Sequence, residues 1–181
     1  MKKLYQKSHA FTLCFLMLLV FAPVLGTAQN QQPVYPRDSI ISAARDIINA
    51  THFCALVTLD SSGQPQVRTM NPFPLGDNFE IWFATSRTSR KVSELKNDPR
   101  VSVYYADHIN ATGYVNIIGK ATVIDDKDLL VKMKRDYWEG IPNWQDVFVL
   151  IKITPVSMDV INYRKGISGQ PGTNRSPSIT F

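Results

Sequence analysis

The feature that most restricts the possible folds is a series of short strand-like segments that fills the chain from residue 53 to residue 163. Each segment is rich in β-branched and aromatic residues and is bounded by turn residues such as Ser61-Ser62-Gly63. The predicted strands are residues 53–60, 64–72, 80–85, 101–106, 114–124, 147–154 and 156–163. Pro155 separates the last two as a bend or edge residue. The succession predicts an antiparallel sheet.

Three short helices are predicted beside these strands. The first begins at Asp38, because the apolar residues that follow recur at helical spacing. The second covers about residues 89–97, and the third runs from Asp126 or Asp128 to about residue 137. About six strands with short helices between them favour a mainly β (α+β) domain, in which a small closed or partly open antiparallel barrel removes the sheet edges.

The first 28 residues have the three regions of a secretory signal peptide in order. A basic Met1-Lys2-Lys3 start precedes an apolar stretch at residues 11–25 and the small residues Gly26-Thr27-Ala28. The apolar stretch is short for a membrane span and contains Pro23 near its end. We therefore expect cleavage near Ala28, export to the periplasm or the medium, and no membrane attachment afterwards. An uncleaved anchor is the alternative.

Cleavage would leave 153 of the 181 residues. Within them we expect a flexible leader at residues 29–37 and a single domain at residues 38–165. The last segment, residues 166–181, is rich in Gly, Pro and Ser, which predicts a flexible tail.

Charge and histidine placement exclude two classes of function. The formal net charge is +5, but three of the 20 basic residues lie in the first ten, which hold no acid, so the remainder has 17 basic and 15 acidic residues. This balance does not predict a nucleic-acid partner. His9, His52 and His108 are scattered without ligand spacing, so we expect no metal site. After cleavage Cys54 is the only cysteine, and its strand-like surroundings favour an inert buried thiol.

The turn at residues 85–91 combines four hydroxyl and three cationic side chains between a strand and a helix: Thr85-Ser86-Arg87-Thr88-Ser89-Arg90-Lys91. A helix N-terminus presents unpaired N–H groups and a positive dipole end, so this composition predicts a site for a dianion such as phosphate. The alternative is a helix capped by Ser or Thr with solvated basic residues. Cations at a helix start oppose the dipole, which favours the anion site.

Two further features are open to two interpretations each. Arg68 lies in the middle of a predicted strand, where a charge commonly points outward to water, but it would form a second cationic grip if its strand abuts the basic turn. Trp138 and Trp144 flank the break at Gly140-Ile141-Pro142 and serve either in packing or as a wall for a planar ligand.

Several segments, in one order along the chain, resemble the pyridoxamine-5′-phosphate oxidase family of FMN-binding split barrels. The segments are Gly63-Gln64-Pro65-Gln66-Val67-Arg68-Thr69-Met70, Phe83-Ala84-Thr85-Ser86-Arg87-Thr88-Ser89-Arg90-Lys91-Val92-Ser93-Glu94-Leu95, Asn97-Asp98-Pro99-Arg100-Val101-Ser102-Val103 and Ile118-Gly119-Lys120-Ala121. The likeness covers about residues 40 to 163. It implies a split β-barrel of antiparallel Greek-key type, and a homodimer with two flavin sites at the subunit interface.

The resemblance also implies which residues bind FMN. By position, Arg68 and Lys91 would hold the phosphate with help from Arg90 and Ser89. The remaining residues implied for cofactor binding are Thr69 and Met70, through their backbone, and Thr85, Ser86, Tyr114 and Trp144. Tyr114 stands where the family has a Gln in contact with the flavin ring, six positions before the Lys of its Gly-Lys pair.

The end of the chain lacks the late Trp and the Arg-rich motif of true pyridoxamine-phosphate oxidases, so the chain is more similar to the general-stress-protein branch. The resemblance implies an exported flavin-dependent oxidoreductase that acts on a small-molecule redox substrate, with the chemistry supplied by FMN and no catalytic side chain identified. Two alternatives remain: a non-catalytic module that binds flavin or haem, and a structural dimer whose pocket has decayed.

Overall fold

The structure, a computed structural model, describes residues 35–181, so the predicted signal peptide and most of the predicted leader lie outside the described residues. The strands are β1 (Cys54–Leu59), β2 (Pro65–Met70), β3 (Ile81–Ser86), β4 (Arg100–Ala106), β5 (Gly113–Ile124), β6 (Phe148–Asn162) and β7 (Ser178–Thr180). The helices are α1 (Arg37–Ala50), α2 (Arg90–Asn97), α3 (Lys127–Lys132) and α4 (Trp144–Val147), with short 3₁₀ helices η1 (Asp136–Gly140) and η2 (Tyr163–Lys165). None of these helices is long and apolar enough to cross a bilayer.

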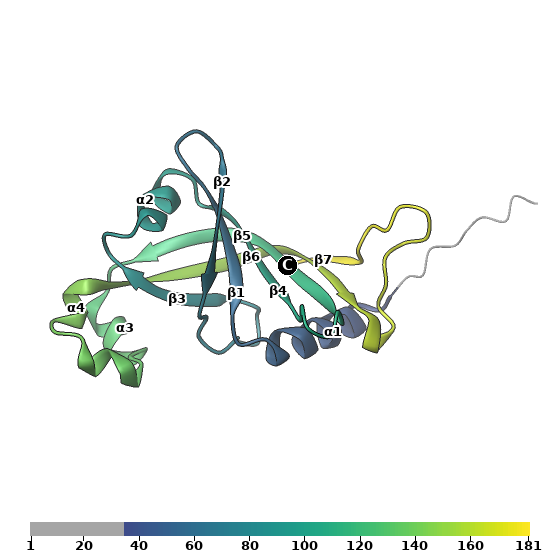
Figure 1. The fold of residues 1–181 in the computed structure, drawn as a ribbon, viewed down its shortest axis with the longest axis horizontal. Helices are drawn as coiled ribbons and strands as arrows, with labels where there is room; N and C mark the ends of the chain where they lie inside the picture. The colour runs from purple at the N-terminus through teal and green to yellow at the C-terminus, as the bar shows by residue number, and fades with distance from the viewer. Residues whose placement is uncertain (1–34) are drawn as a thin grey trace, which may run out of the picture. The chain divides into compact units, whose positions relative to one another are not determined.

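All seven strands join one antiparallel sheet in the order β2-β1-β4-β5-β6-β3, with β7 added beside β6. The sheet curls, as Figure 1 shows, so that the β1–β2 hairpin rises across the long strands β5 and β6. β2 and β3 end the strand order, and they do not pair along their length. Only the N–H of Phe73, just after β2, donates to the carbonyl of Trp82 on β3, at 2.8 Å. The predicted mainly β split barrel is confirmed.

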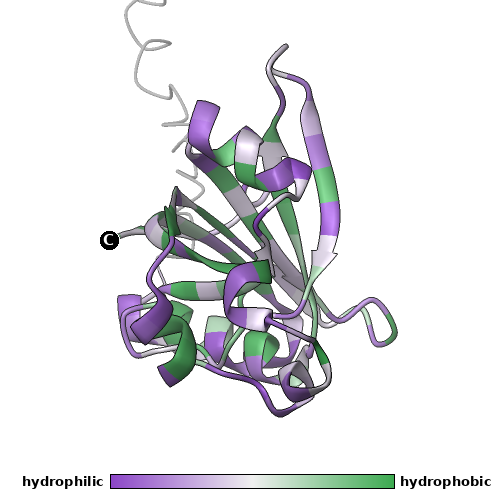
Figure 2. Cartoon of the chain, turned by 90° about the vertical axis from the view of Figure 1, so that its left-hand side faces the viewer, coloured by the Kyte–Doolittle hydropathy of each residue, from purple (hydrophilic) through white to green (hydrophobic). Residues whose placement is uncertain are grey.

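The core follows from the alternation of apolar residues along the strands. β1 and β3 both alternate between buried and half-buried residues, which places one face of each strand inside. Helix α1 covers one end of the sheet with Ile40, Ala43, Ala44, Ile47 and Ile48, all buried. Figure 2 shows hydrophobic and hydrophilic segments alternating along the strands and helices, which is the pattern of a domain with a single main core.

The predicted pair of strands around Pro155 is a single strand, β6, and the expectation of two strands is wrong. The register between β5 and β6 shifts at Ile118 and Gly119, where Ile118 is opposite Ser157 and Gly119 is opposite Pro155. A bulge leaves one residue unpaired, so the missing N–H of Pro155 is accommodated without ending the strand.

The C-terminal segment is part of the fold rather than a separate flexible tail. Ile179 is buried on β7, which pairs with β6, and Ile167 is buried and bridges to Asn162. The two apolar side chains add buried area to the main core, and this burial is the physical reason for the difference from the expected tail.

Two helix boundaries also differ from the predicted ones. α1 begins after Pro36, and Asp38 lies in the first turn, where an acid interacts favourably with the dipole. The predicted third helix is interrupted after Lys132, and the chain continues into η1, which buries Trp138 completely against Phe148. The large apolar surface of the indole explains why burial prevails over continuation of the helix.

Candidate functional site

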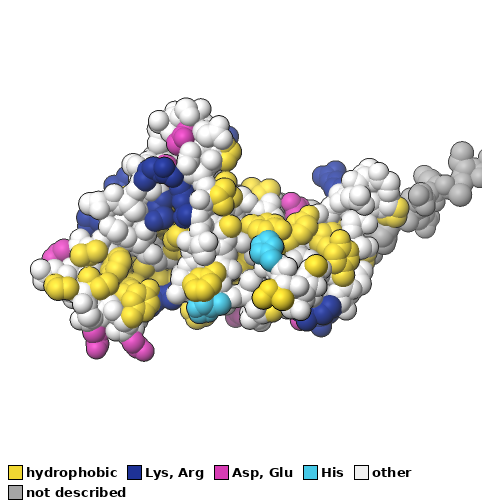
Figure 3. Space-filling view, in the orientation of Figure 1, with side chains coloured by type: hydrophobic (Ala, Val, Ile, Leu, Met, Phe, Trp, Pro, Cys, Tyr) yellow, Lys and Arg dark blue, Asp and Glu magenta, His cyan; other side chains and the backbone are white. Residues whose placement is uncertain are grey.

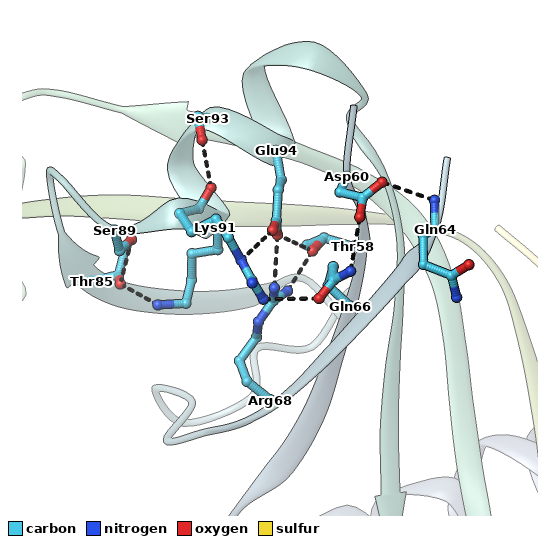
Figure 4. A network of polar contacts seen from close by, with 11 residues as sticks. Thr58, Asp60, Gln64, Gln66, Arg68, Thr85, Ser89, Lys91, Ser93 and Glu94 are labelled. Carbon is cyan, nitrogen blue, oxygen red and sulfur yellow. Dashed lines mark hydrogen bonds and ion pairs between the residues drawn. The ribbon is translucent and has the colours of Figure 1, made fainter. Parts of the chain in front are cut away.

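The polar site lies between the two strands that end the sheet order. Arg68 comes from β2, Thr85 from β3, and Lys91 from the first turn of α2, which follows β3 directly. Figure 4 shows two adjacent sets of polar contacts, one of Arg68 around Glu94 and one of Lys91 with Thr85 and Ser89. The fold therefore brings together the mid-strand cation and the basic turn, which are more than 15 residues apart in the sequence.

Glu94, on α2, is the centre of this network and is only 5 % exposed. Its Oε2 accepts hydrogen bonds from the Nη2 of Arg68 at 2.7 Å and from the hydroxyl of Thr58 at 2.5 Å. Arg68 also donates to the Thr58 hydroxyl. The Nε of Arg90 is 2.8 Å from Oε1, but no donor is aligned for a hydrogen bond to that oxygen. Glu94 thus pairs with Arg68 and Arg90, while its Oε1 accepts no hydrogen bond.

Burial and charge shift the protonation of two groups in the site. Burial raises the pKa of Glu94, but hydrogen bonds from Thr58 and Arg68 and the charges of Arg68 and Arg90 lower that pKa below its ordinary value. Burial lowers the pKa of Lys91, the nearby Arg68 charge lowers it further, and Glu94 partly opposes both. Arg68 thus affects the charge of Lys91, and Figure 4 shows their side chains on the same side of Glu94.

The hydroxyls at the start of α2 face the Lys91 ammonium rather than capping the helix. Lys91 donates to the Thr85 hydroxyl at 2.9 Å, and Thr85 and Ser89 hydroxyl oxygens are 3.2 Å apart. Ser89 occupies the N-cap position of α2 but its side chain forms no capping hydrogen bond. The first-turn N–H groups therefore have no N-cap side chain as a partner, in contrast to the capped-helix alternative.

Arg90 and Arg87, the other two cations of the basic turn, contact different parts of the molecule. Arg90 donates to the side chain of Gln66 on β2 at 2.9 Å, so it stays beside Arg68. Arg87 instead pairs with Asp125 and donates to the carbonyl of Asp146 at 3.0 Å, which removes it from the site. Figure 3 shows Lys and Arg side chains gathered where α2 lies beside the β1–β2 hairpin.

The charge and donors of this cluster fit a phosphate dianion. Arg68, Arg90 and Lys91 contribute three positive charges and Glu94 one negative charge, so these four side chains sum to +2. The carboxylate of Asp60 is linked to them only through Gln66. A guanidinium has five N–H donors and an ammonium three. The hydrogen bonds of Arg68 and Lys91 within the described residues use two and one of these donors, respectively. Donors therefore remain for an incoming anion.

Thr69 and Met70 follow Arg68 on β2, an edge strand. Edge strands have backbone N–H and C=O groups without a strand partner on one side, and these groups can bind the polar edge of a planar ring. Met70 is buried, whereas Thr69 is exposed on the opposite face. The Cys54 thiol donates to the Met70 carbonyl at 3.9 Å, and burial raises the pKa of this thiol to about 12. Cys54 is thus an inert buried thiol, as the sequence indicates.

Three of the predicted residues lie outside the polar network. Ser86 is at the rim, with its hydroxyl 3.1 Å from that of Thr88. Tyr114 is stacked on Tyr104 and its hydroxyl is 2.5 Å from that of Ser176. Trp144 packs on Trp138 in a small second core below α3 and α4, which is the packing role of the two alternatives.

Tyr114 and Arg68 belong to opposite faces of the sheet. Tyr114 shares a hollow with Val67, the residue before Arg68, and successive strand residues point to opposite faces. A single chain therefore does not bring Tyr114 to the cationic cluster of Arg68, Arg90 and Lys91. No group of three or more potential metal ligands exists among residues 35–181.

Sequence reasoning missed Thr58, Gln66 and Glu94. The only local signals were the four-residue spacing of Arg90 and Glu94 on α2 and the position of Thr58 on the same strand face as buried Leu56. Neither signal shows that a buried acid receives Arg68, because that contact depends on how the hairpin and α2 pack.

Comparison with known proteins agrees with the fold. The family described as Pyridoxamine 5′-phosphate oxidase matches residues 40–162. Many solved structures are similar, and three of them are described below, whereas no curated protein matches. General Stress Protein 26 from Bacillus anthracis str. Sterne is 25% identical, with a TM-score of 0.54 over 68% of this chain and 92% of its own.

The other two structures are less similar in sequence. A pyridoxamine 5′-phosphate oxidase-related, FMN binding protein from Nostoc punctiforme is 15% identical, with a TM-score of 0.56 over 82% of this chain and 98% of its own. A heme binding protein from Mycobacterium smegmatis is 18% identical, with a TM-score of 0.57 over 81% of this chain and 59% of its own. The chain is thus an antiparallel split barrel with a cationic site between its edge strands. It belongs to the pyridoxamine 5′-phosphate oxidase family.

Proposed function

We propose that this protein binds FMN and is an exported flavin-dependent oxidoreductase. The single observation that carries the proposal is that Arg68, bound to Glu94, and Lys91, bound to Thr85, lie side by side between β2 and α2. The FMN binding protein from Nostoc punctiforme supports the cofactor, and General Stress Protein 26 supports the branch of the family. Export rests on the signal-peptide pattern of residues 1–28.

Each part of the cluster has a separate task in this proposal. Lys91 and Arg68 bind the phosphate, and the free N–H groups at the start of α2 add donors. Glu94 orients Arg68 and keeps the total charge matched to a dianion. The backbone of Thr69 and Met70 holds the polar edge of the ring. Bound FMN supplies hydride transfer, while the protein supplies position and electrostatics.

The proposal includes a homodimer that completes the site. The sheet face that carries Ala55, Val57 and Tyr104 is partly apolar, with Val67 65 % exposed, and Ser102, Asn116 and Asp159 add polar groups to it. Figure 3 shows hydrophobic side chains gathered over β4 and β5 on this face. A second copy would cover this surface, and it would bring a second Tyr114 toward the interface.

A non-catalytic binding module is the second candidate function. The favouring observation is that Tyr114, which replaces the ring-contacting Gln, is hydrogen-bonded to Ser176 and stacked on Tyr104 rather than directed at Arg68. The heme binding relative from Mycobacterium smegmatis shows that the fold also serves a binding protein. Such a module would hold flavin or haem without turnover.

A titration that compares FMN with riboflavin tests the phosphate site. We expect FMN to bind at least 10-fold more tightly than riboflavin, because only FMN has the dianion. Lys91→Met and Arg68→Met should each weaken FMN binding by about 10- to 100-fold, since a charge-assisted hydrogen bond contributes about 1.5–3 kcal/mol. Riboflavin binding should be unchanged. Quenching of flavin fluorescence measures both affinities.

The matched control is Lys96→Met, which removes an exposed cation from the last turn of the same helix. FMN affinity should be the same as in the parent. Equal affinity of the parent for FMN and riboflavin contradicts the phosphate site. Reduction of the bound flavin by NADH or NADPH supports the oxidoreductase, whereas tight flavin binding without reduction by either donor, or a haem Soret band, supports the binding module.

A further inference from the structure

A cavity of about 400 Å³ lies between the end of α1 and the segment that follows β2. Its volume is within the range of small-molecule sites. Its apolar wall includes Phe73 and Leu75, and the polar side chains on its wall are those of Asn49, Thr51, His52, Asn71, Tyr105 and Arg135. None of the residues that form the phosphate-binding cluster contributes to this wall, so the cavity is a separate feature.

Arg135 is held in place at this cavity by contacts on two sides. Its Nη2 donates to the carbonyls of Asn71 at 3.2 Å and Pro72 at 2.7 Å. Its guanidinium carbon lies 4.2 Å from the centre of the Phe73 ring, a cation–π contact. These contacts fix a planar cation before any ligand arrives, which lowers the entropy cost of binding.

The charge of Arg135 has no acidic partner. No Asp or Glu lines the cavity, and Arg135 forms no ion pair with any residue from 35 to 181. Its two hydrogen bonds use the two Nη2 hydrogens, so the three N–H groups on Nε and Nη1 have no acceptor in the described part of the chain. A guanidinium with free donors matches a carboxylate in two-point geometry.

The position of the cavity relates it to the proposed flavin site. Asn71 and Pro72 follow Met70, whose backbone is proposed to hold the flavin ring. Tyr105, also on the cavity wall, is close to Cys54, which donates to the Met70 carbonyl. A molecule in the cavity would therefore lie next to the ring.

We infer that this cavity binds the substrate, a small carboxylate with a flat apolar body, and that Arg135 grips its carboxylate. Phe73 and Leu75 contact the apolar body, and Asn49 and Asn71 add polar contacts. Only the identification of the bound carboxylate as the substrate rests on the proposed function. Binding of the carboxylate itself depends on residues of the cavity and not on FMN.

Calorimetric titration of the purified protein with benzoate, and with benzyl alcohol as its uncharged analogue, tests the assignment. We expect benzoate to bind at least 10-fold more tightly than benzyl alcohol. Arg135→Met should abolish this preference, and Arg135→Lys, which keeps the charge, should retain part of it. The matched control Lys132→Met removes an exposed cation from α3 and should leave the preference intact.

Two outcomes overturn the inference: equal affinity of the parent for benzoate and benzyl alcohol, or an unchanged preference in Arg135→Met. Thermal unfolding of Arg135→Met checks that the variant is folded. The comparison of the two ligands in the parent does not depend on the stability of this variant. Lys91→Met separates the two proposals, since it should weaken FMN binding while benzoate keeps its preference. If FMN shows no preference over riboflavin but benzoate is still preferred, the proposed function is contradicted and the carboxylate site is not.

Discussion

Glu94 is an acid placed among cations that would otherwise repel one another. It accepts from Arg68 and Thr58 and lies 2.8 Å from the Nε of Arg90. Like charges held close together in a buried place are unfavourable unless an opposite charge balances them. Glu94 therefore allows the site to keep three cations in the absence of a ligand, while the net charge of +2 still favours a dianion.

Replacement of this acid by its neutral isostere should destabilise the fold in a pH-dependent way. At pH 7 we expect Glu94→Gln to lower the free energy of unfolding by about 3 kcal/mol, because it leaves Arg68 buried without its counter-charge. The folded-state pKa of Glu94 lies below the ordinary value of 4.5. The stabilisation is therefore full above pH 4.5 and is lost as the pH falls through the folded-state pKa.

Urea denaturation of parent and variant at a series of pH values measures the effect. The difference between them should shrink below pH 4.5, since a protonated Glu94 resembles glutamine. The control Glu139→Gln removes an exposed acid paired with Lys134 and should change stability by less than about 0.5 kcal/mol. A difference that is absent at pH 7, or is the same at every pH, argues against the role of Glu94.

β5 and β6 form the longest strand pair of the sheet. β6 runs unbroken for 15 residues because a register shift between Ile118 and Gly119 accommodates Pro155. Gly119 is required at this shift, since a Cβ there would be 2.6 Å from the carbonyl oxygen of Thr154 and 2.9 Å from Ile153 Cγ2. The close approach of two backbones thus depends on the absence of a side chain.

A methyl group at this position should therefore strain the strand pair. We expect Gly119→Ala to lower the free energy of unfolding by about 1–3 kcal/mol through overpacking. The control Gly140→Ala places a Cβ where no atom lies within 4 Å and should have little effect. Chemical denaturation measures the free energy of unfolding of both variants. Equal values would show that the two strands accommodate a Cβ at residue 119 without loss of stability.

At the level of the assembly, one protomer leaves an apolar sheet face in contact with solvent. Val67, Ile118 and Val156 are exposed large hydrophobic residues on strands. Exposed apolar groups that gather in one patch are typical of interaction surfaces. The proposed homodimer would bury this face, which lies opposite the face that carries Arg68.

Mass spectrometry of the full-length gene product recovered from a secreting host tests this arrangement. Under denaturing conditions we expect a chain that begins at Gln29, because the signal peptide is removed. Under native conditions the mass should correspond to two such chains. A native monomer at micromolar concentration contradicts the dimer, and a chain that still carries residues 1–28 contradicts cleavage.

The amino-acid sequence alone was sufficient to predict the class of fold and the position of the basic turn. Strand and helix signals are local, because they depend on the spacing of apolar residues and on turn residues between them. The positions of Arg68 on a strand and Lys91 at a helix start could therefore be predicted. The interpretation of residues 166–181 as a tail failed because the burial of Ile179 depends on β6, a distant segment.

The contacts that give the site its properties required the folded arrangement. Arg68 and Glu94 are 26 residues apart, and Thr58 and Glu94 are 36 apart, so their hydrogen bonds exist only because the hairpin and α2 pack together. The separation of Tyr114 from Arg68 follows from the face of the sheet on which each side chain falls. Residue type is a local property, but distance, burial and charge balance arise only when strands far apart in the chain become neighbours.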